Sequence, residues 1–250
     1  MIFLLYASTC HPQIKYQGDG KIGRGGCHQV ALTGQVMIVD FNDGSGSVVS
    51  DKSGYGNQGR LTGATWVGGD SAAYGMALYF DGVDDSVSMA LSDTLEFDTS
   101  ASFSVSIMTY VNTFAGSWDM PLEKGSGYPA SGWDYEWGAT SQTSVISDKF
   151  SDTTVTFVSQ PVLGQWVSGV LVINRTTQLA IPYFNYVQGT ARSIRGLGSM
   201  VNATRPLAFS LPSYHYKGVL DDVRVYARAL TPLDMDNERM NRKRHLCYTK

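Results

Sequence analysis

Five aromatic side chains gather between residues 118 and 137 of this 250-residue chain. They are Trp118, Tyr128, Trp133, Tyr135 and Trp137. The last three alternate with Asp134 and Glu136, so a strand here would carry rings on one face and carboxylates on the other. Sugar rings stack on aromatic planes while polar neighbours bind their hydroxyls, a mixed lining that is typical of ligand sites. The pattern predicts a sugar-binding surface made of these seven residues.

The alternating rings can instead fill a core, because one face of each sheet in a sandwich buries large residues. In that interpretation Trp133, Tyr135 and Trp137 pack inside the protein. The carboxylates of Asp134 and Glu136 then face solvent. The sequence leaves both interpretations open.

Trp118 and Tyr128 lie in segments rich in Gly, Ser and Pro, which are typical of loops. Loops lie at the surface and carry binding residues disproportionately, so we expect both rings to be exposed. His215 lies in another predicted loop, 213–217, where it borders a ligand groove or is simply a surface residue. We include His215 among the candidate ligand-binding residues.

Asp221 lies in a segment of alternating residues, where a period of two places it on one face with Val219, Val223 and Val225. A carboxylate among valines is expected inside, where an unpaired charge costs several kcal/mol. It therefore needs a cation or several N–H donors. The glycine-rich segment 51–59 offers either. We predict a calcium site formed by Asp51, Asn57 and Asp221; the alternative is a carboxylate that holds this loop by hydrogen bonds alone.

Catalytic patterns are scarce in the sequence. A glycosidase needs two carboxyl groups, and Asp134 and Glu136 form a pair that a strand would place on one face. No Gly-x-Ser-x-Gly motif, zinc-type histidine spacing or glycine-rich phosphate loop occurs. We therefore expect no catalytic residues.

Short alternating segments separated by turn residues dominate the chain from residue 35 onward. The expected strands cover 36–41, 76–80, 86–89, 103–111, 153–158, 166–173, 179–184, 206–210 and 219–226. Many short strands without alternating helices predict an all-β, antiparallel sandwich or barrel. One helix is expected from Pro232 to Met240, with Thr231 as its N-cap.

Charge divides the chain into an acidic body and two basic ends. Residues 1–36 sum to +2 and residues 238–250 to +4, which leaves −9 for the rest of a chain whose net charge is −3. An acidic body makes nucleic-acid binding by the body unfavourable. No apolar run approaches the roughly 18 residues of a membrane span. We expect an arm over 1–34, one domain over 35–235 and a basic tail over 236–250.

The first ten residues, MIFLLYASTC, are apolar but have no basic segment before them, so they make no convincing signal peptide. We expect the N-terminal arm to pack on its own sandwich as an edge strand, or on another chain of an assembly. The three cysteines, Cys10, Cys27 and Cys247, show no disulfide framework, so their redox state stays open.

Four ordered blocks resemble the laminin-G-like branch of the concanavalin A-like lectin/glucanase superfamily over about residues 35–235. They are 41–46 with 51–59, 78–85 with the strand 103–111, 163–166 with 183–187, and 217–226 with 229–231. The resemblance implies a two-sheet jelly roll that binds glycans or proteins, often with calcium. Asn42 stands where a carboxylate is usual and Met108 where Trp is frequent. The superfamily's glucanases carry three acids on one strand, whereas 134–136 has two.

These features predict a non-catalytic, glycan-binding recognition or adhesion module on an extracellular or virion surface, with a glycan or a surface protein as partner. The alternative is a structural or decoration protein of a virion or other assembly, whose arm and basic tail contact other subunits. A polysaccharide-active enzyme is the third possibility.

Overall fold

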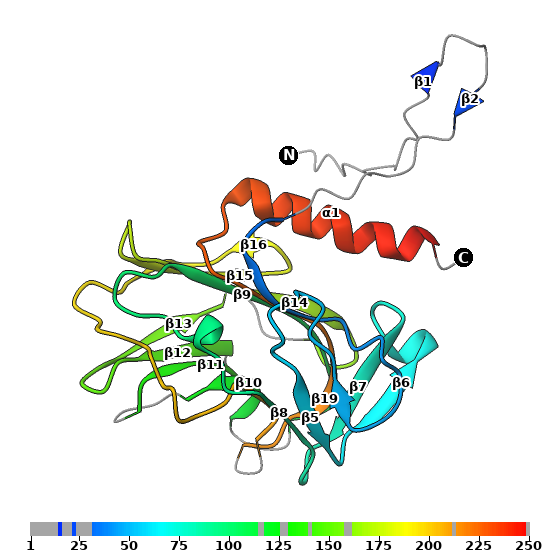
Figure 1. Cartoon of the computed structure of the whole chain (residues 1–250), viewed down its shortest axis with the longest axis horizontal. Coiled ribbons are helices and arrows are strands. Elements are labelled where there is room, and N and C mark those ends of the chain that lie inside the picture. The colour runs from blue at the N-terminus through cyan, green and yellow to red at the C-terminus, as the bar shows by residue number, and fades with distance from the viewer. Residues whose placement is uncertain are drawn as a thin grey trace.

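The computed structural model describes residues 32–114, 118–125, 130–139, 142–157, 162–211 and 214–248, together with 15–16 and 22–23. For 15–16, 22–23 and 241–248 it describes the backbone alone. The body is a sandwich of two antiparallel sheets, which confirms the predicted all-β fold (Figure 1). Within the described residues, no helix is both long enough and apolar enough to cross a membrane.

One sheet has eight strands among the described residues. In hydrogen-bonded order they are β13 (Asp152–Thr156), β12 (Gln142–Ser147), β11 (Gly132–Trp137), β10 (Asp119–Lys124), β18 (Ala208–Phe209), β8 (Ser86–Met89), β5 (Gly59–Thr62) and β4 (Val48–Val49). The sequence did not predict β10 or β12, because a proline and charged residues interrupt the first and polar residues dominate the second.

The other sheet has nine strands among the described residues. Its main path runs β16 (Val187–Gln188), β15 (Leu179–Phe184), β14 (Trp166–Asn174), β9 (Phe103–Val111), β19 (Lys217–Tyr226), β7 (Met76–Asp81) and β6 (Thr65–Gly68), while β17 (Arg192–Ser193) pairs with β15 and β3 (Gln35–Val39) with β19. The β3–β19 pairing confirms that the segment 36–41 lies beside 219–226. Two short 3-10 helices, η1 (Gly69–Ser71) and η2 (Asp93–Leu95), lie in the connections.

The main core fills the space between the two sheets. The alternation in β9 directs Phe103, Val105 and Ile107 inward, where they lie in one buried cluster with residues of β11. A second cluster lies on the outer side of the nine-stranded sheet, where Val170 and Val172 meet Tyr226, Leu230 and Met235. This second cluster buries Met235 near the start of the C-terminal helix.

The C-terminal helix α1 (Pro232–Tyr248) begins where the sequence predicted (Figure 1). Thr231 Oγ1 accepts the backbone N–H of Asp234, and Asp234 Oδ2 accepts the N–H of Thr231 at 2.8 Å. This reciprocal cap satisfies two N–H groups at the helix N-terminus. The helix continues to Tyr248, past Met240 where the sequence predicted its end, so 241–248 of the predicted basic tail is also helical.

Of the predicted arm, 1–34, the structure describes residues 32–34 and a two-stranded hairpin. There β1 (Lys15–Tyr16) pairs with β2 (Ile22–Gly23). The predicted packing of the arm concerns residues that lie outside the described ones, so it stays a prediction.

Arg228 joins the helix cap to the body, and this contact generates the first prediction. Its guanidinium makes two hydrogen bonds to Asp234, of 2.7 and 2.9 Å. These bonds lower the pKa of Asp234 from 3.8 to about 2. Stabilisation by the carboxylate is therefore complete above about pH 4 and is lost as the pH falls through about 2.

We expect Asp234→Asn to lower the free energy of unfolding at pH 7 by about 1–2 kcal/mol, since a cap and a charged pair are lost. The variant should also lose stability less steeply between pH 4 and pH 2 in urea titrations. Asp236→Asn is the matched control, because Asp236 is exposed and its ion pair with Arg239 spans 3.2 Å. Such an exposed pair is worth little. Equal effects of the two substitutions would contradict this account.

Candidate functional site

The alternating rings of β11 lie in the core rather than on a ligand surface. Trp133, Tyr135 and Trp137 are each at most 1 % exposed. Tyr135 Oη donates to the carbonyl of Val105 on the opposite sheet at 2.8 Å. A Cβ atom on Gly169 would lie 3.2 Å from both Tyr135 and Trp137, so this glycine makes room for the rings. The prediction that these three rings bind sugar is wrong, and the core interpretation is correct.

The two acids of β11 accept hydrogen bonds from the neighbouring strand β12. Asp134 is buried, not solvent-facing, and its Oδ1 accepts the N–H of Val145 at 2.8 Å. Glu136 is half-buried and its Oε2 accepts the hydroxyl of Thr143 at 3.1 Å. Burial and the nearby charge of Asp152 raise the pKa of Glu136. The structure therefore gives both carboxylates a role within the sheet, and it separates them from the rings on the other face.

Trp118 is 46 % exposed, as expected for a loop residue. Tyr128 lies outside the described residues. His215 is partly exposed, and the chain beside it is joined to the Trp118 segment because the N–H of Met120 donates to the carbonyl of Tyr214. The structure thus brings Trp118 and His215 to neighbouring segments, next to the exposed ring of Tyr214.

Asp221 is fully buried, as predicted, but it does not lie on the core face that the alternation predicted. A β-bulge interrupts β19 after Asp221, where Asp222 has a φ of 47°. The extra residue reverses the alternation, so Leu220 and Val223 both belong to the main core while Asp221 lies with Val219 on the outer side. There Asp221 Oδ2 accepts the backbone N–H of Tyr74 at 2.8 Å.

Asp51 holds its glycine-rich loop by hydrogen bonds. Its Oδ1 accepts the N–H groups of Ile38 and Ser53, and its Oδ2 accepts the hydroxyl of Ser53 and the N–H of Asn57. Burial alone would raise the pKa of Asp51, but these donors lower it overall. Four donors occupy the roughly four lone-pair directions of a carboxylate.

This donor set does not fit a cation at Asp51, because the lone pairs that calcium needs already accept hydrogen atoms. The amide of Asn57 is engaged as well, since it donates to the carbonyl of Val36 and accepts from Thr94. The contact of Asp221 described above is with a different loop. The hydrogen-bonded alternative therefore accounts for Asp51 and Asn57, while calcium binding by the protein stays a prediction.

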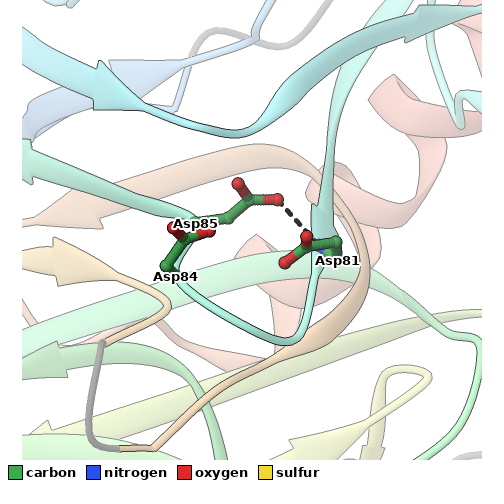
Figure 2. Close-up of side chains that lie close together, drawn as sticks. All are labelled: Asp81, Asp84 and Asp85. Carbon is green, nitrogen blue, oxygen red and sulfur yellow. Dashed lines mark hydrogen bonds between the residues drawn. The ribbon is translucent and has the colours of Figure 1, made fainter.

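A different acidic group comes closest to a metal-ligand cluster. Asp81, Asp84 and Asp85 offer one carboxylate oxygen each within 4.8 Å of one another, the only such group of three among the described residues. Figure 2 shows them around the β7–β8 turn, where Asp85 accepts the N–H of Asp81 at 2.7 Å. Burial raises the pKa of Asp85, and its two acidic neighbours add to this effect. The contacts explain the group as a capped turn, and they assign it no ion.

A row of residues across the outer side of the nine-stranded sheet was not predicted. Thr65, Tyr79, Val219, Tyr110 and Trp166 are directly opposite one another on the consecutive strands β6, β7, β19, β9 and β14. Directly opposite residues share one face of a sheet. Neighbouring strands lie about 4.8 Å apart, so Tyr79 and Tyr110 stand roughly 10 Å apart with Val219 between them.

This aromatic row forms the floor of a cavity of about 280 Å³. Its lining consists of Val67, Asp70, Ser71, Tyr79, Tyr110, Asn112 and Val219. Trp166 extends the row past Tyr110, with ring centroids 5.7 Å apart. We call this cavity, with Trp166, the aromatic cleft. Its aromatic floor and polar rim give the mixed lining expected of a ligand site.

One wall of the aromatic cleft depends on Asp221. The wall is the loop that contains η1, with Asp70 and Ser71, and it continues to Tyr74. The hydrogen bond from the Tyr74 N–H to Asp221 fastens this loop to the sheet. Asp221 is thus a positioning residue for this wall of the cleft.

The lining of the aromatic cleft is suited to binding rather than to acid–base chemistry. Asp70 is the only carboxylate among the described residues that line the cleft. No His, Cys or Lys belongs to this described lining. Period-two alternation in 103–111 places Tyr110 on the non-core face, so the sequence contained part of the signal. The register that aligns Tyr110 with Tyr79 and Trp166 could not be derived from that alternation.

Several solved structures share this fold. The binding domain of Paraclostridial Mosquitocidal Protein 1 superposes with a TM-score of 0.69 at 15% identity, over 82% of this chain and 52% of that one. The binding domain of botulinum neurotoxin serotype G gives 0.65 at 14% identity, over 82% and 50%. Domain 4 of AbnA, a GH43 extracellular arabinanase from Geobacillus stearothermophilus solved with arabinotriose, gives 0.61 at 15% identity, over 81% and 97%.

This chain spans about half the length of the toxin binding domains that it matches. No family model matches the sequence, and no curated protein matches it. At such low identities the likeness shows the fold alone. It supports the two-sheet sandwich implied by the laminin-G-like resemblance, while membership of that branch stays a prediction.

The saturated carboxylate of Asp51 generates the second prediction. We expect Asp51→Asn to lower the free energy of unfolding by about 1–3 kcal/mol, because an amide would turn its N–H₂ toward buried donors. The loss should be the same in millimolar calcium and in chelator when melting curves are compared. A loss that appears in calcium alone would instead place a cation at this loop, since a ligand bound by the folded state adds stability.

Proposed function

We propose that this protein is a non-catalytic carbohydrate-binding module and that its ligand lies in the aromatic cleft. The observation that carries the proposal is the aligned row of Tyr79, Val219, Tyr110 and Trp166 on the outer side of a regular sheet. Flat apolar rings there can stack on the C–H faces of sugars. Asp70, Ser71 and Asn112 on the rim can bind hydroxyl groups.

The order of the row suggests how the ligand lies. The row crosses the strands, so a chain of sugar units would run perpendicular to them, from Tyr79 over Val219 to Tyr110 and Trp166. The cavity has a volume of about 280 Å³. That volume is slightly below the range of common pockets for drug-sized ligands. The cleft therefore suits a short part of a glycan rather than a whole large one.

Catalysis is not part of this proposal, because hydrolysis of a glycosidic bond ordinarily needs two carboxyl groups. The cleft lining provides Asp70 alone. The fold likeness to an arabinanase domain solved with arabinotriose supports the choice of a sugar as the ligand. That enzyme's description as extracellular supports our placement of this module outside the cell or on a particle surface.

The third prediction tests the ligand class. A glycan array that includes arabino-oligosaccharides should give at least one ligand for the full chain, and arabinotriose is the first probe for calorimetry. We expect Tyr110→Ala to weaken binding about 10- to 100-fold, which corresponds to ~1.4–2.8 kcal/mol. The physical reason is the loss of a stacking ring at the centre of the row.

Tyr55→Ala is the matched control, because Tyr55 is an exposed tyrosine that does not line the cleft. The melting temperature of each variant separates lost binding from lost folding. Folded protein that binds no glycan would contradict the proposal. Equal binding by the Tyr55 and Tyr110 variants would place the ligand elsewhere.

A further inference from the structure

A second cavity, of about 240 Å³, lies beside the hairpin that joins β12 to β13. Its lining consists of Ser131, Asp148, Lys149, Phe150, Gly198, Ser199 and Val201. These residues lie in loops, next to the ends of β11 and β12 and in the segment 198–201, and none of them lines the aromatic cleft. We call this cavity the hairpin pocket, and it is separate from the proposed glycan site.

Hydrogen bonds fix the hairpin tip beside the pocket. Asp148 Oδ1 accepts the N–H groups of Phe150 and Ser151, at 2.7 and 2.8 Å. Its Oδ2 accepts the N–H of Gly198, which ties the hairpin to the opposite wall. Burial alone would raise the pKa of Asp148, but these N–H donors lower it overall. The carboxylate is therefore ionised at neutral pH and links the two walls of the pocket.

Lys149 occupies a strained position at this tip. Its φ of 100° lies in a region that favours glycine. A non-glycine residue adopts such a φ at a cost in free energy. The side chain is exposed, and it takes part in none of the ion pairs formed by the described residues. Strained residues cluster at binding sites, where the surrounding structure over-determines them.

Three other groups lie at or near the pocket: the ring of Phe150, the hydroxyl of Ser199 and the guanidinium of Arg175. The ring of Phe150 is 87 % exposed although its backbone N–H is fixed. Ser199 Oγ accepts the N–H of Val201 at 3.2 Å. The hydrogen of that hydroxyl can still be donated to a ligand. The nearby guanidinium of Arg175 donates to the carbonyls of Leu197 and Gly198.

The charge of Arg175 is already balanced by two carboxylates. Asp98 and Asp148 lie near enough to Arg175 to raise its pKa, against the larger effect of burial, which lowers it. Lys149 has no such ion pair among the described residues. Lys149 is therefore the cation that the pocket offers to a ligand.

We propose that the hairpin pocket binds an anionic sugar, independently of the aromatic cleft. The ammonium of Lys149 would bind the anionic group, which a carboxylate or a sulfate can supply. The ring of Phe150 would contact the C–H face of the sugar. The hydroxyl of Ser199 would donate to a ring substituent. The backbone that carries Lys149 and Phe150 is fixed by the hydrogen bonds to Asp148 before the ligand arrives, which lowers the cost of ordering them.

The experiment is a titration of the full, ¹⁵N-labelled chain with three probes: glucuronate, glucose 6-sulfate and glucose. The amide signals of 148–151 and 197–201 should shift with one or both anionic sugars. The dissociation constant from these shifts should be at least tenfold lower than that for glucose. The two anionic probes distinguish a carboxylate site from a sulfate site. Lys149→Gln should abolish the preference for the anion and Lys149→Arg should keep it.

Matched controls separate a site from general charge effects. Lys52→Gln removes the same charge from an exposed lysine outside the pocket, so it should leave the preference intact. Tyr110→Ala should also leave it intact, so failure of the cleft proposal would not affect this result. Equal binding of all three probes, or an unchanged preference in Lys149→Gln, would overturn the proposal. Binding of a tetraglutamate peptide in place of both sugars would do so too and would assign the pocket to an acidic protein.

The strain gives an independent measurement. Lys149→Gly should raise the melting temperature, because glycine adopts a positive φ freely, and it should also lose the anionic preference. Gain of stability together with loss of binding is the pattern of a residue kept for function. A lower melting temperature in this variant would show that Lys149 is not strained, and it would remove the basis of the proposal.

Discussion

The bulge in β19 decides which side chains of the central strand face the core. β19 pairs with β9 along one edge and with β7 and then β3 along the other, so its register reaches much of the nine-stranded sheet. One inserted residue at Asp222 lets Leu220, Val223 and Val225 all pack inside. Arg224 binds the carboxylate of Asp222 with two hydrogen bonds, of 2.7 and 3.0 Å, and so fixes the bulge.

The same bulge produces the two parts of the aromatic cleft. It leaves Val219 on the outer side, where its small side chain separates Tyr79 from Tyr110. It also turns Asp221 outward to the N–H of Tyr74, which fastens the wall loop. The floor therefore consists of strand residues whose positions are set by ladder hydrogen bonds. Sites on regular strands are held more precisely than sites on loops, so little free energy is needed to order this floor on binding.

Alternation in the sequence predicted most of the longer strands and the sandwich, and Thr231 with Pro232 predicted the start of α1, because each depends on local residue order. It failed at Asp221, since one extra residue reverses every face beyond it and leaves no mark in the hydrophobic pattern. It also could not decide whether Trp133 and Tyr135 faced a ligand or a core. Alternation shows which residues share a face, but only the packing of the second sheet shows which face is covered.

The aromatic cleft and the loop of Asp51 both show why residue type alone does not define a site. A carboxylate near glycine-rich backbone has the same composition whether it binds a cation or accepts N–H donors. The number of hydrogen bonds that the carboxylate accepts distinguishes the two cases, and Asp51 accepts four. Likewise Tyr79, Tyr110 and Trp166 lie far apart in the sequence and become one surface only through register. The rigid floor supplies shape, so under the proposed function selectivity among sugars would come from the few polar groups of the rim. Asp70 and Ser71 belong to the loop that Asp221 fastens, so the bulged strand supports both the floor and the rim of the cleft.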